Sequence, residues 1–93
     1  MTERTVLSAR LQASRRLKGL TQQQLAQRAA LSMQTIARIE QGRTTQILTG
    51  ALERLSQILE VSTDYLLGLD DDPRPRRRRV DPETDELMAV PYV

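Results

Sequence analysis

The sequence contains no cysteine and no histidine, and only two of its 93 residues are aromatic, both of them tyrosines. Without these residues the chain can form neither disulfides nor the Cys/His zinc sites common in small domains. The same absence excludes histidine acid–base catalysis and cysteine nucleophiles, so we do not expect an enzyme. With so few rings, a core must be built from Leu, Ile, Val, Ala and Met, which suits packed helices.

Long apolar runs are also missing. No stretch approaches the ~20 apolar residues that a membrane-spanning helix needs. The first ten residues, MTERTVLSAR, lack the hydrophobic segment of a secretion signal. We therefore expect a cytoplasmic protein.

The net charge of +2 is unevenly distributed along the chain. Residues 1–69 hold nine Arg and Lys against five Asp and Glu, a net charge of +4. Residues 70–93 hold five Arg against seven Asp and Glu, a net charge of −2. The basic first part indicates a polyanionic partner. The change in composition predicts a helical domain over 1–69 and a charged linker and tail over 70–93, either disordered or with a short helix beginning at Asp81-Pro82-Glu83.

Helical spacing of apolar residues within 1–69 predicts five helices. The expected ranges are 5–18, 22–29, 33–41, 50–60 and 63–67. Gly19 and Gly68 are natural helix stops, and Ser32 and Ser62 are natural N-caps. Thr21, followed three residues later by Gln24, predicts a capping box.

The second and third expected helices are short and joined by the tight link Ala30-Leu31-Ser32, which describes a helix-turn-helix. Two helices that cross closely need a small residue such as Ala26, while Ile36 fills the angle between them. Neither helix would be stable alone, so they must share a core. The second helix is then left with one exposed flank, and an exposed helix fits the major groove of DNA.

A helical wheel of residues 33–41 places Ile36, Ile39 and Glu40 on the inner side. The outer side carries Gln34, Ala37, Arg38 and Gln41, with Met33 and Thr35 at the flanks. Gln can bond adenine and Arg can bond guanine in bidentate fashion, so this side is suited to reading bases. Exposed Gln and Arg are otherwise ordinary solvated residues, and the motif favours the first interpretation.

Two segments together, GLTQQQLAQRAALSMQTIARIEQG and LERLSQILEVSTDYLLG, resemble the Cro/C1-type helix-turn-helix regulators, also called the XRE family. The resemblance covers about residues 6–68. It implies an all-α, five-helix bundle of the lambda-repressor-like type that binds operator DNA, needs no cofactor and forms a homodimer. It leaves open a phage-type repressor, a restriction–modification controller or an antitoxin.

The resemblance also implies roles for individual residues. Base contacts are expected from Met33, Gln34, Thr35 and Arg38, and phosphate contacts from Gln22, Ser32, Arg43 and Thr44. For Gln22 the resemblance also allows a role in supporting the recognition helix. Arg15 and Glu40 match a charge pair that ties the first helix to the third. The dimer surface is expected on the last two helices, with Tyr65 and Leu66 as candidates.

The sequence departs from the family pattern in three places. Ala30 stands where Gly is common in the turn, and a positive φ there would cost roughly 1 kcal/mol. The loop 43–49 lacks the usual Pro and is slightly long. Met33 stands where a polar residue often reads a base.

The tail allows further interpretations. The arginine run within 74–79 is either a DNA arm, a partner for the acidic residues at 70–72 or 81–86, or solvated charge. The final ELMAVPYV is apolar enough to dock, so a second hypothesis is a protein-interaction module, antitoxin-like, whose tail captures a partner protein.

Overall fold

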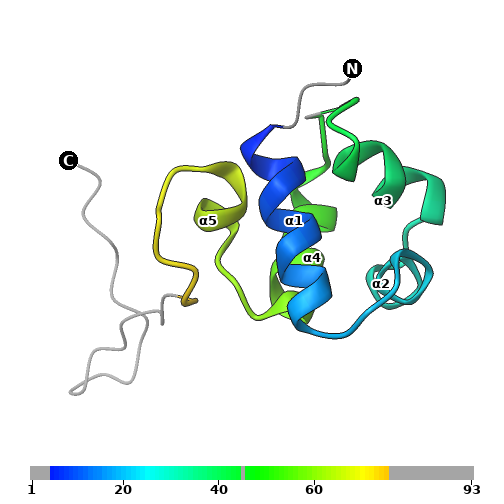
Figure 1. Ribbon diagram of the computed structural model, residues 1–93, viewed down its shortest axis with the longest axis horizontal. Coiled ribbons are helices and arrows are strands. Elements are labelled where there is room, and N and C mark those ends of the chain that lie inside the picture. Colours follow the sequence, from blue (N-terminus) through cyan, green and yellow to red (C-terminus); the bar gives the residue numbers. More distant parts are fainter. Residues whose placement is uncertain (1–4, 45, 76–93) are drawn as a thin grey trace, which may run out of the picture.

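The computed structural model describes residues 5–44 and 46–75, and over these residues the chain is entirely helical or irregular (Figure 1). The helices are α1 Val6–Leu17, α2 Gln22–Ala29, α3 Met33–Glu40, α4 Thr49–Leu59 and α5 Thr63–Leu67. The predicted all-α class with five helices is confirmed for this part of the chain. None of these helices is long and apolar enough to cross a membrane. The predicted helix start at Asp81, most of the arginine run and the final ELMAVPYV lie outside the described residues.

The helix ends follow the predicted signals because each cap is a local contact. Thr21 accepts a hydrogen bond from the Gln24 amide, and the Gln24 side chain accepts one from the Thr21 amide, which completes the capping box. The Ser32 hydroxyl caps α3, and the Ser62 hydroxyl caps α5 by accepting from the Tyr65 amide. Each of these bonds satisfies an amide that lacks a partner inside its helix.

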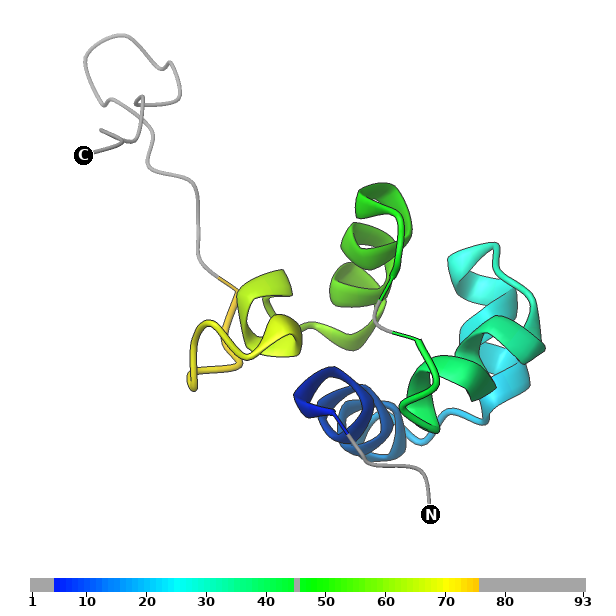
Figure 2. The ribbon, with the colours of Figure 1, turned by 90° about the horizontal axis from the view of Figure 1, so that it is seen from above.

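The helices form a closed ring of contacts around one core. α1 contacts α3, α3 contacts α2, α2 contacts α4, α4 contacts α5, and α5 returns to α1 (Figures 1 and 2). Buried aliphatic side chains from all five helices and from the α1–α2 connection fill the centre: Leu7, Leu11, Leu20, Leu25, Ala26, Ala29, Ile36, Ile39, Leu52, Leu55, Leu59 and Leu66. The shortness of α2 and α3 is therefore offset by burial that each shares with its neighbours.

Two turns use a left-handed backbone at residues other than glycine. Ala30, between α2 and α3, has φ 55° and ψ 41°, and Glu60, after α4, has φ 57° and ψ 40°. After Ala30, the Leu31 amide donates to the Ala26 carbonyl at 2.9 Å, which closes the end of α2. The sequence expectation for Ala30 holds, since the turn imposes the conformation that glycine adopts more easily.

The packed part of the chain continues past Leu69, where the sequence predicted the start of a linker. The main-chain oxygen of Asp70 accepts a hydrogen bond from Arg10 Nη1 at 2.7 Å, and that of Pro73 accepts one from the Ser62 amide at 2.9 Å. Asp71 forms an ion pair with Arg10 at 3.0 Å. Residues 70–75 therefore lie against the helical domain, although composition alone assigns them to the tail.

Candidate nucleic-acid interface

The two sides of α3 differ as the helical wheel predicts. Ile36 and Ile39 are almost completely buried, and so is Glu40. Gln34 and Arg38 are exposed, and Ala37 is half-buried between them. α3 lies at the edge of the molecule in both views (Figures 1 and 2). One polar flank of α3 is therefore accessible to a large partner.

The first turn of α3 carries two hydroxyls that bond to each other. Ser32 Oγ accepts a hydrogen bond from the Thr35 amide at 3.1 Å and lies 2.8 Å from Thr35 Oγ1. One hydroxyl hydrogen is used between the two side chains, so the pair has one hydrogen left to donate outward. Met33, beside them, is about half exposed. Ser32 thus combines its predicted capping role with a position at the start of the exposed flank.

Behind α3, Arg15 of α1 and Glu40 form a two-point ion pair. Arg15 Nε donates to Glu40 Oε2 at 2.7 Å, and Arg15 Nη2 donates to Glu40 Oε1 at 2.9 Å. The remaining Nη1 donates to the Leu20 carbonyl at 2.8 Å. The pKa of Arg15 is raised, chiefly because its guanidinium donates hydrogen bonds to Glu40. The expected structural pair is present in the structure, and it joins α1, α3 and the connection to α2.

Gln22, at the start of α2, lies beside this pair. Its side chain is half-buried, and its Nε2 donates to Glu40 Oε1 at 3.3 Å. In this position the amide nitrogen supports Glu40 through one of its two hydrogens, and the second hydrogen is the group that a phosphate could accept. The structure therefore connects Gln22 to the placement of α3 more directly than to the expected phosphate contact.

The loop after α3 holds the two other residues expected to contact phosphate. Arg43 is exposed, and its amide donates to the Arg38 carbonyl at 3.0 Å, which closes the end of α3. The Thr44 hydroxyl accepts from the Gln46 amide at 3.1 Å and donates to the Gln46 carbonyl at 3.4 Å. Arg43 is thus accessible, whereas the hydroxyl of Thr44 is engaged within the loop.

The expected dimer candidates are placed differently by α5. The prediction that Leu66 lies on the dimer surface is wrong, because its side chain is fully buried in the core. Tyr65 is half-buried, and the Arg10 guanidinium lies 4.2 Å from the centre of its ring. The exposed apolar residues here are Leu67 and Leu69, with 43% and 75% of their surface accessible.

Sequence reasoning missed two arginines that make long-range contacts. Arg10 donates to the Tyr65 carbonyl at 2.6 Å as well as to Asp70 and Asp71. Arg54 of α4 donates from Nε to the Ala29 carbonyl at 2.8 Å. Neither contact has a local sequence signal, because the partners lie 25 or more residues apart.

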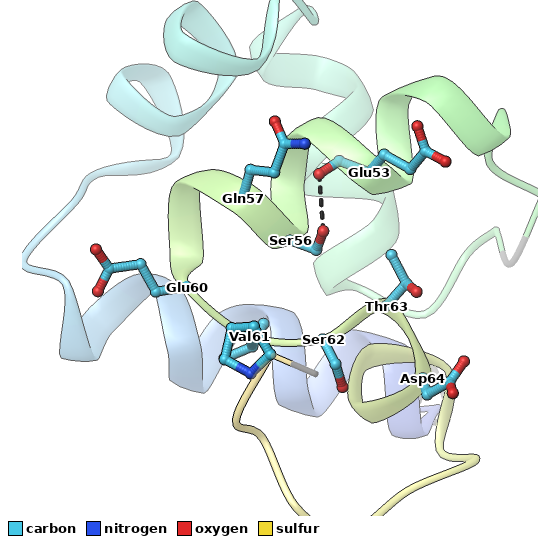
Figure 3. A pocket seen from close by; sticks show the side chains of 9 residues that line it. Glu53, Ser56, Gln57, Glu60, Val61, Ser62, Thr63 and Asp64 are labelled. Carbon is cyan, nitrogen blue, oxygen red and sulfur yellow. Dashed lines mark hydrogen bonds between the residues drawn. The ribbon is translucent and has the colours of Figure 1, made fainter. Parts of the chain in front are cut away.

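A depression of about 520 Å³ lies between α4 and α5 and carries acidic side chains (Figure 3). Its lining includes Glu53, Glu60 and Asp64, and no residue of α2 or α3. The Ser56 hydroxyl donates to the Glu53 carbonyl within it. Carboxylates repel phosphates, so this depression is unsuited to a nucleic acid and distinct from the flank of α3.

Comparison with known proteins agrees with this geometry. A family model described as a helix-turn-helix domain matches residues 6–77. The N-terminal DNA-binding domain of SinR from Bacillus subtilis is similar, with 30% identity, a TM-score of 0.63, and coverage of 66% of this chain and 88% of that one. The hypothetical transcription factor NHTF from Neisseria shows 28% identity and a TM-score of 0.63, over 69% of this chain and 71% of that one. No curated protein sequence matches significantly.

Two further structures show how much of each chain the similarity covers. SinR in its complex with SinI shows 30% identity and a TM-score of 0.63, and the match covers 66% of this chain but 59% of that SinR chain. The restriction-modification controller C.AhdI from Aeromonas hydrophila, at 24% identity and a TM-score of 0.60, shares the fold over 66% of this chain and 91% of that one. With its matched helix-turn-helix and its exposed α3, the chain belongs to the Cro/C1-type (XRE) family of helix-turn-helix transcriptional regulators.

Proposed function

We propose that this protein is a repressor that recognises a palindromic operator as a homodimer by inserting α3 into the major groove of double-stranded DNA. The observation that carries the proposal is the contrast between the two sides of α3. Gln34 and Arg38 are exposed on one side, while Glu40 on the other is held by Arg15. A polar flank on a helix fixed from behind is suited to reading base edges.

The exposed side chains match the donors and acceptors of base pairs. Arg38 would donate two hydrogen bonds to the O6 and N7 of guanine, and Gln34 would pair with the N6 and N7 of adenine. Each such pair discriminates against the wrong base by about 1–3 kcal/mol. Met33 and Ala37 offer apolar contact to a thymine methyl group, and Thr35 offers a hydroxyl.

Phosphate contacts would fix the position of α3 along the groove. Arg43 is exposed just after α3, and the one hydroxyl hydrogen that the Ser32–Thr35 pair does not use internally lies at the start of the helix. These groups carry the phosphate role better than Thr44, whose hydroxyl is engaged with Gln46. Their contribution is independent of sequence and weakens as salt is added.

A similar protein supports DNA as the partner. SinR, described as the master regulator for biofilm formation, has been crystallised in complex with DNA. It shares 30% identity and a TM-score of 0.63 with this protein, over 66% of this chain and 97% of that one. The family model described as a helix-turn-helix domain, which matches residues 6–77, includes α2 and α3 of this chain.

A homodimer would place two α3 helices in successive major grooves, ~34 Å apart, and would read a palindrome. The surface we propose for pairing is the exposed apolar part of α5 and its extension, Leu67 and Leu69, with Tyr65 at its border. Leu66 has no part in it, because its side chain is buried.

The decisive experiment is selection of bound duplexes from a random pool by the full chain. The proposal predicts an enriched site with two inverted half-sites about one helical turn apart. If the protein binds DNA but enriches no sequence, its binding is only electrostatic and the proposed operator recognition is wrong. If it binds no DNA at all, the whole proposal is refuted. Sedimentation of the protein with the selected duplex would give the number of chains bound, expected to be two.

A protein partner is the second candidate, favoured by the complex of the similar SinR protein with SinI. Here the tail would do the capturing. Comparing the full chain with residues 1–75, which keep the contacts of Asp70, Asp71 and Pro73, separates the two functions. If the tail serves a partner, the shorter chain loses that partner and keeps the operator.

A further inference from the structure

Arg54 connects α4 to the end of α2. Its Nε donates a hydrogen bond of 2.8 Å to the main-chain oxygen of Ala29. Ala29 is the last residue of α2, so its carbonyl belongs to the group that no amide of the same helix can satisfy. The guanidinium also places a positive charge at the negative end of the α2 dipole. Arg54, a residue of α4, therefore supplies the hydrogen bond that the last carbonyl of α2 lacks.

The residue that follows this carbonyl is Ala30, in the left-handed conformation. Its φ of 55° is one that glycine adopts freely and that alanine disfavours. This turn sets the direction in which α3 leaves α2, because Ser32 already caps α3 two residues later. A conformation that its own residue disfavours persists where the surroundings hold it. The bond from Arg54 is such a support, one residue before the turn.

The course of the Arg54 side chain explains how it reaches the turn. A Cβ built on Gly50, one helical turn earlier in α4, would lie 3.6 Å from Arg54 Nη1. The guanidinium thus lies back over the first turn of α4, and the α2–α4 contact brings it to Ala29. The Nε–H is directed at the Ala29 carbonyl, while Nη1 lies toward Gly50.

We infer that Arg54 is a positioning residue for DNA recognition, which acts by holding the Ala29–Ala30 turn and hence the angle at which α3 meets the groove. The inference rests on the proposed function. Arg54 itself belongs to α4 and bonds the far end of α2, whereas the base-reading residues proposed above all belong to α3. Its loss should reduce the share of molecules whose α3 is correctly placed, and apparent affinity falls with that share.

The test compares Arg54→Met with Arg28→Met in the full chain. Methionine keeps an unbranched side chain of similar length and removes the donor and the charge. Arg28 is exposed in the last turn of α2, so its variant removes the same charge near the same helix end. Binding to the selected operator and to an unrelated duplex is measured well below the melting temperature, where every variant is folded. The exchange rate of the Leu31 amide, which bonds the Ala26 carbonyl, is measured on the free protein.

The expected result is a loss of about three- to tenfold in operator affinity for Arg54→Met, with a smaller loss on the unrelated duplex. Arg28→Met should change both duplexes alike. The Leu31 amide should exchange faster in Arg54→Met, relative to amides inside α1. Adding Ala30→Gly to Arg54→Met should restore part of the affinity, because glycine adopts the turn conformation without support.

Two results would overturn the inference. In the first, the affinity for the operator relative to the unrelated duplex changes equally in Arg54→Met and Arg28→Met. The loss of a positive charge would then explain both variants, without any role for the turn. The other is an unchanged Leu31 exchange rate in Arg54→Met. If the wild type prefers no sequence at all, the proposed function fails instead, and the exchange measurement still decides whether Arg54 holds the turn.

Discussion

Arg15 and Glu40 face each other across the α1–α3 contact with two parallel hydrogen bonds of 2.7 and 2.9 Å. The Glu40 side chain is only 2% exposed and that of Arg15 only 11%. Removing one member of a buried pair leaves the other charge without compensation, which costs more than the pair contributes when intact. The pair therefore makes the position of α3 depend on α1, a helix outside the helix-turn-helix.

Replacing Glu40 by Gln should lower the free energy of unfolding by about 3 kcal/mol, because Arg15 is left charged in a mostly buried site. The matched control is Gln41→Ala, at the exposed neighbouring position, which should change it by less than about 0.5 kcal/mol. Urea titration of the purified variants measures both values. Equal stability of the two variants would show that the ion pair contributes nothing.

Replacing Ala30 by Gly should raise the free energy of unfolding by about 0.5–1 kcal/mol. The native φ of 55° strains alanine, and the relief exceeds the extra freedom that glycine gives the unfolded chain. Ala13→Gly is the control, since Ala13 is an exposed residue in the middle of α1. That variant should lose about 1 kcal/mol of unfolding free energy, because glycine disfavours a helix. A destabilised Ala30→Gly protein would mean that the turn carries no strain.

Much of this fold could be predicted from the sequence because its signals are local. Thr21 with Gln24 and Ser32 with its own helix are separated by three residues or fewer, so the caps and helix bounds follow from short spacings. The inner side of α3 follows from helical periodicity in the same way. The strain at Ala30 was expected from the family resemblance, since Ala30 stands where Gly is common in this turn.

Contacts between distant segments could not be predicted from spacing. Arg54 meets Ala29 across 25 residues, and Arg10 meets Asp70 across 60. Leu66 was mistaken for a surface residue because α5 has five residues, too few for periodicity to show which side faces the core. The acidic composition of residues 70–72 indicated a solvated linker, whereas Arg10 binds two of these residues to the domain.

The exposed pair of Lys18 and Glu60 should make stability depend on pH. The Lys18 ammonium donates a hydrogen bond to Glu60 and lowers the pKa of that carboxyl below its ordinary value. A lowered carboxyl pKa contributes stability above the ordinary pKa, and the contribution is lost as the pH falls through the pKa of the folded state. Glu60→Gln should therefore be less stable than wild type near about pH 7, and the difference should shrink as the pH falls through the pKa of the Glu60 carboxyl in the folded state. A difference that persists in acid would place its origin elsewhere.

Replacing Arg43 by Ala should weaken binding to every duplex by the same factor. Arg43 is exposed after α3 and is proposed to contact a phosphate, which carries no base information. The slope of log affinity against log salt should become shallower by about 0.9 for each phosphate contact that is lost, hence by about 1.8 for the two chains of the homodimer. Titration of operator and unrelated duplexes at several salt concentrations measures it. A loss confined to the operator would assign Arg43 to base reading instead.

Replacing Arg38 by Ala should, unlike the Arg43 variant, weaken binding to the operator more than binding to unrelated duplexes. Its side chain is exposed on the flank of α3, where a bidentate contact to guanine would be worth about 1–3 kcal/mol. Since the homodimer loses one such contact in each half-site, the variant should bind its best site at least about fivefold more weakly and lose its preference at one base pair in each half-site. Arg16→Ala, which removes the same charge from an exposed position of α1, should leave the selected sequence unchanged. Because charge loss is equal in both variants, an altered base preference in Arg38→Ala alone would come from lost readout, and an unchanged preference would remove Arg38 from the base-reading surface.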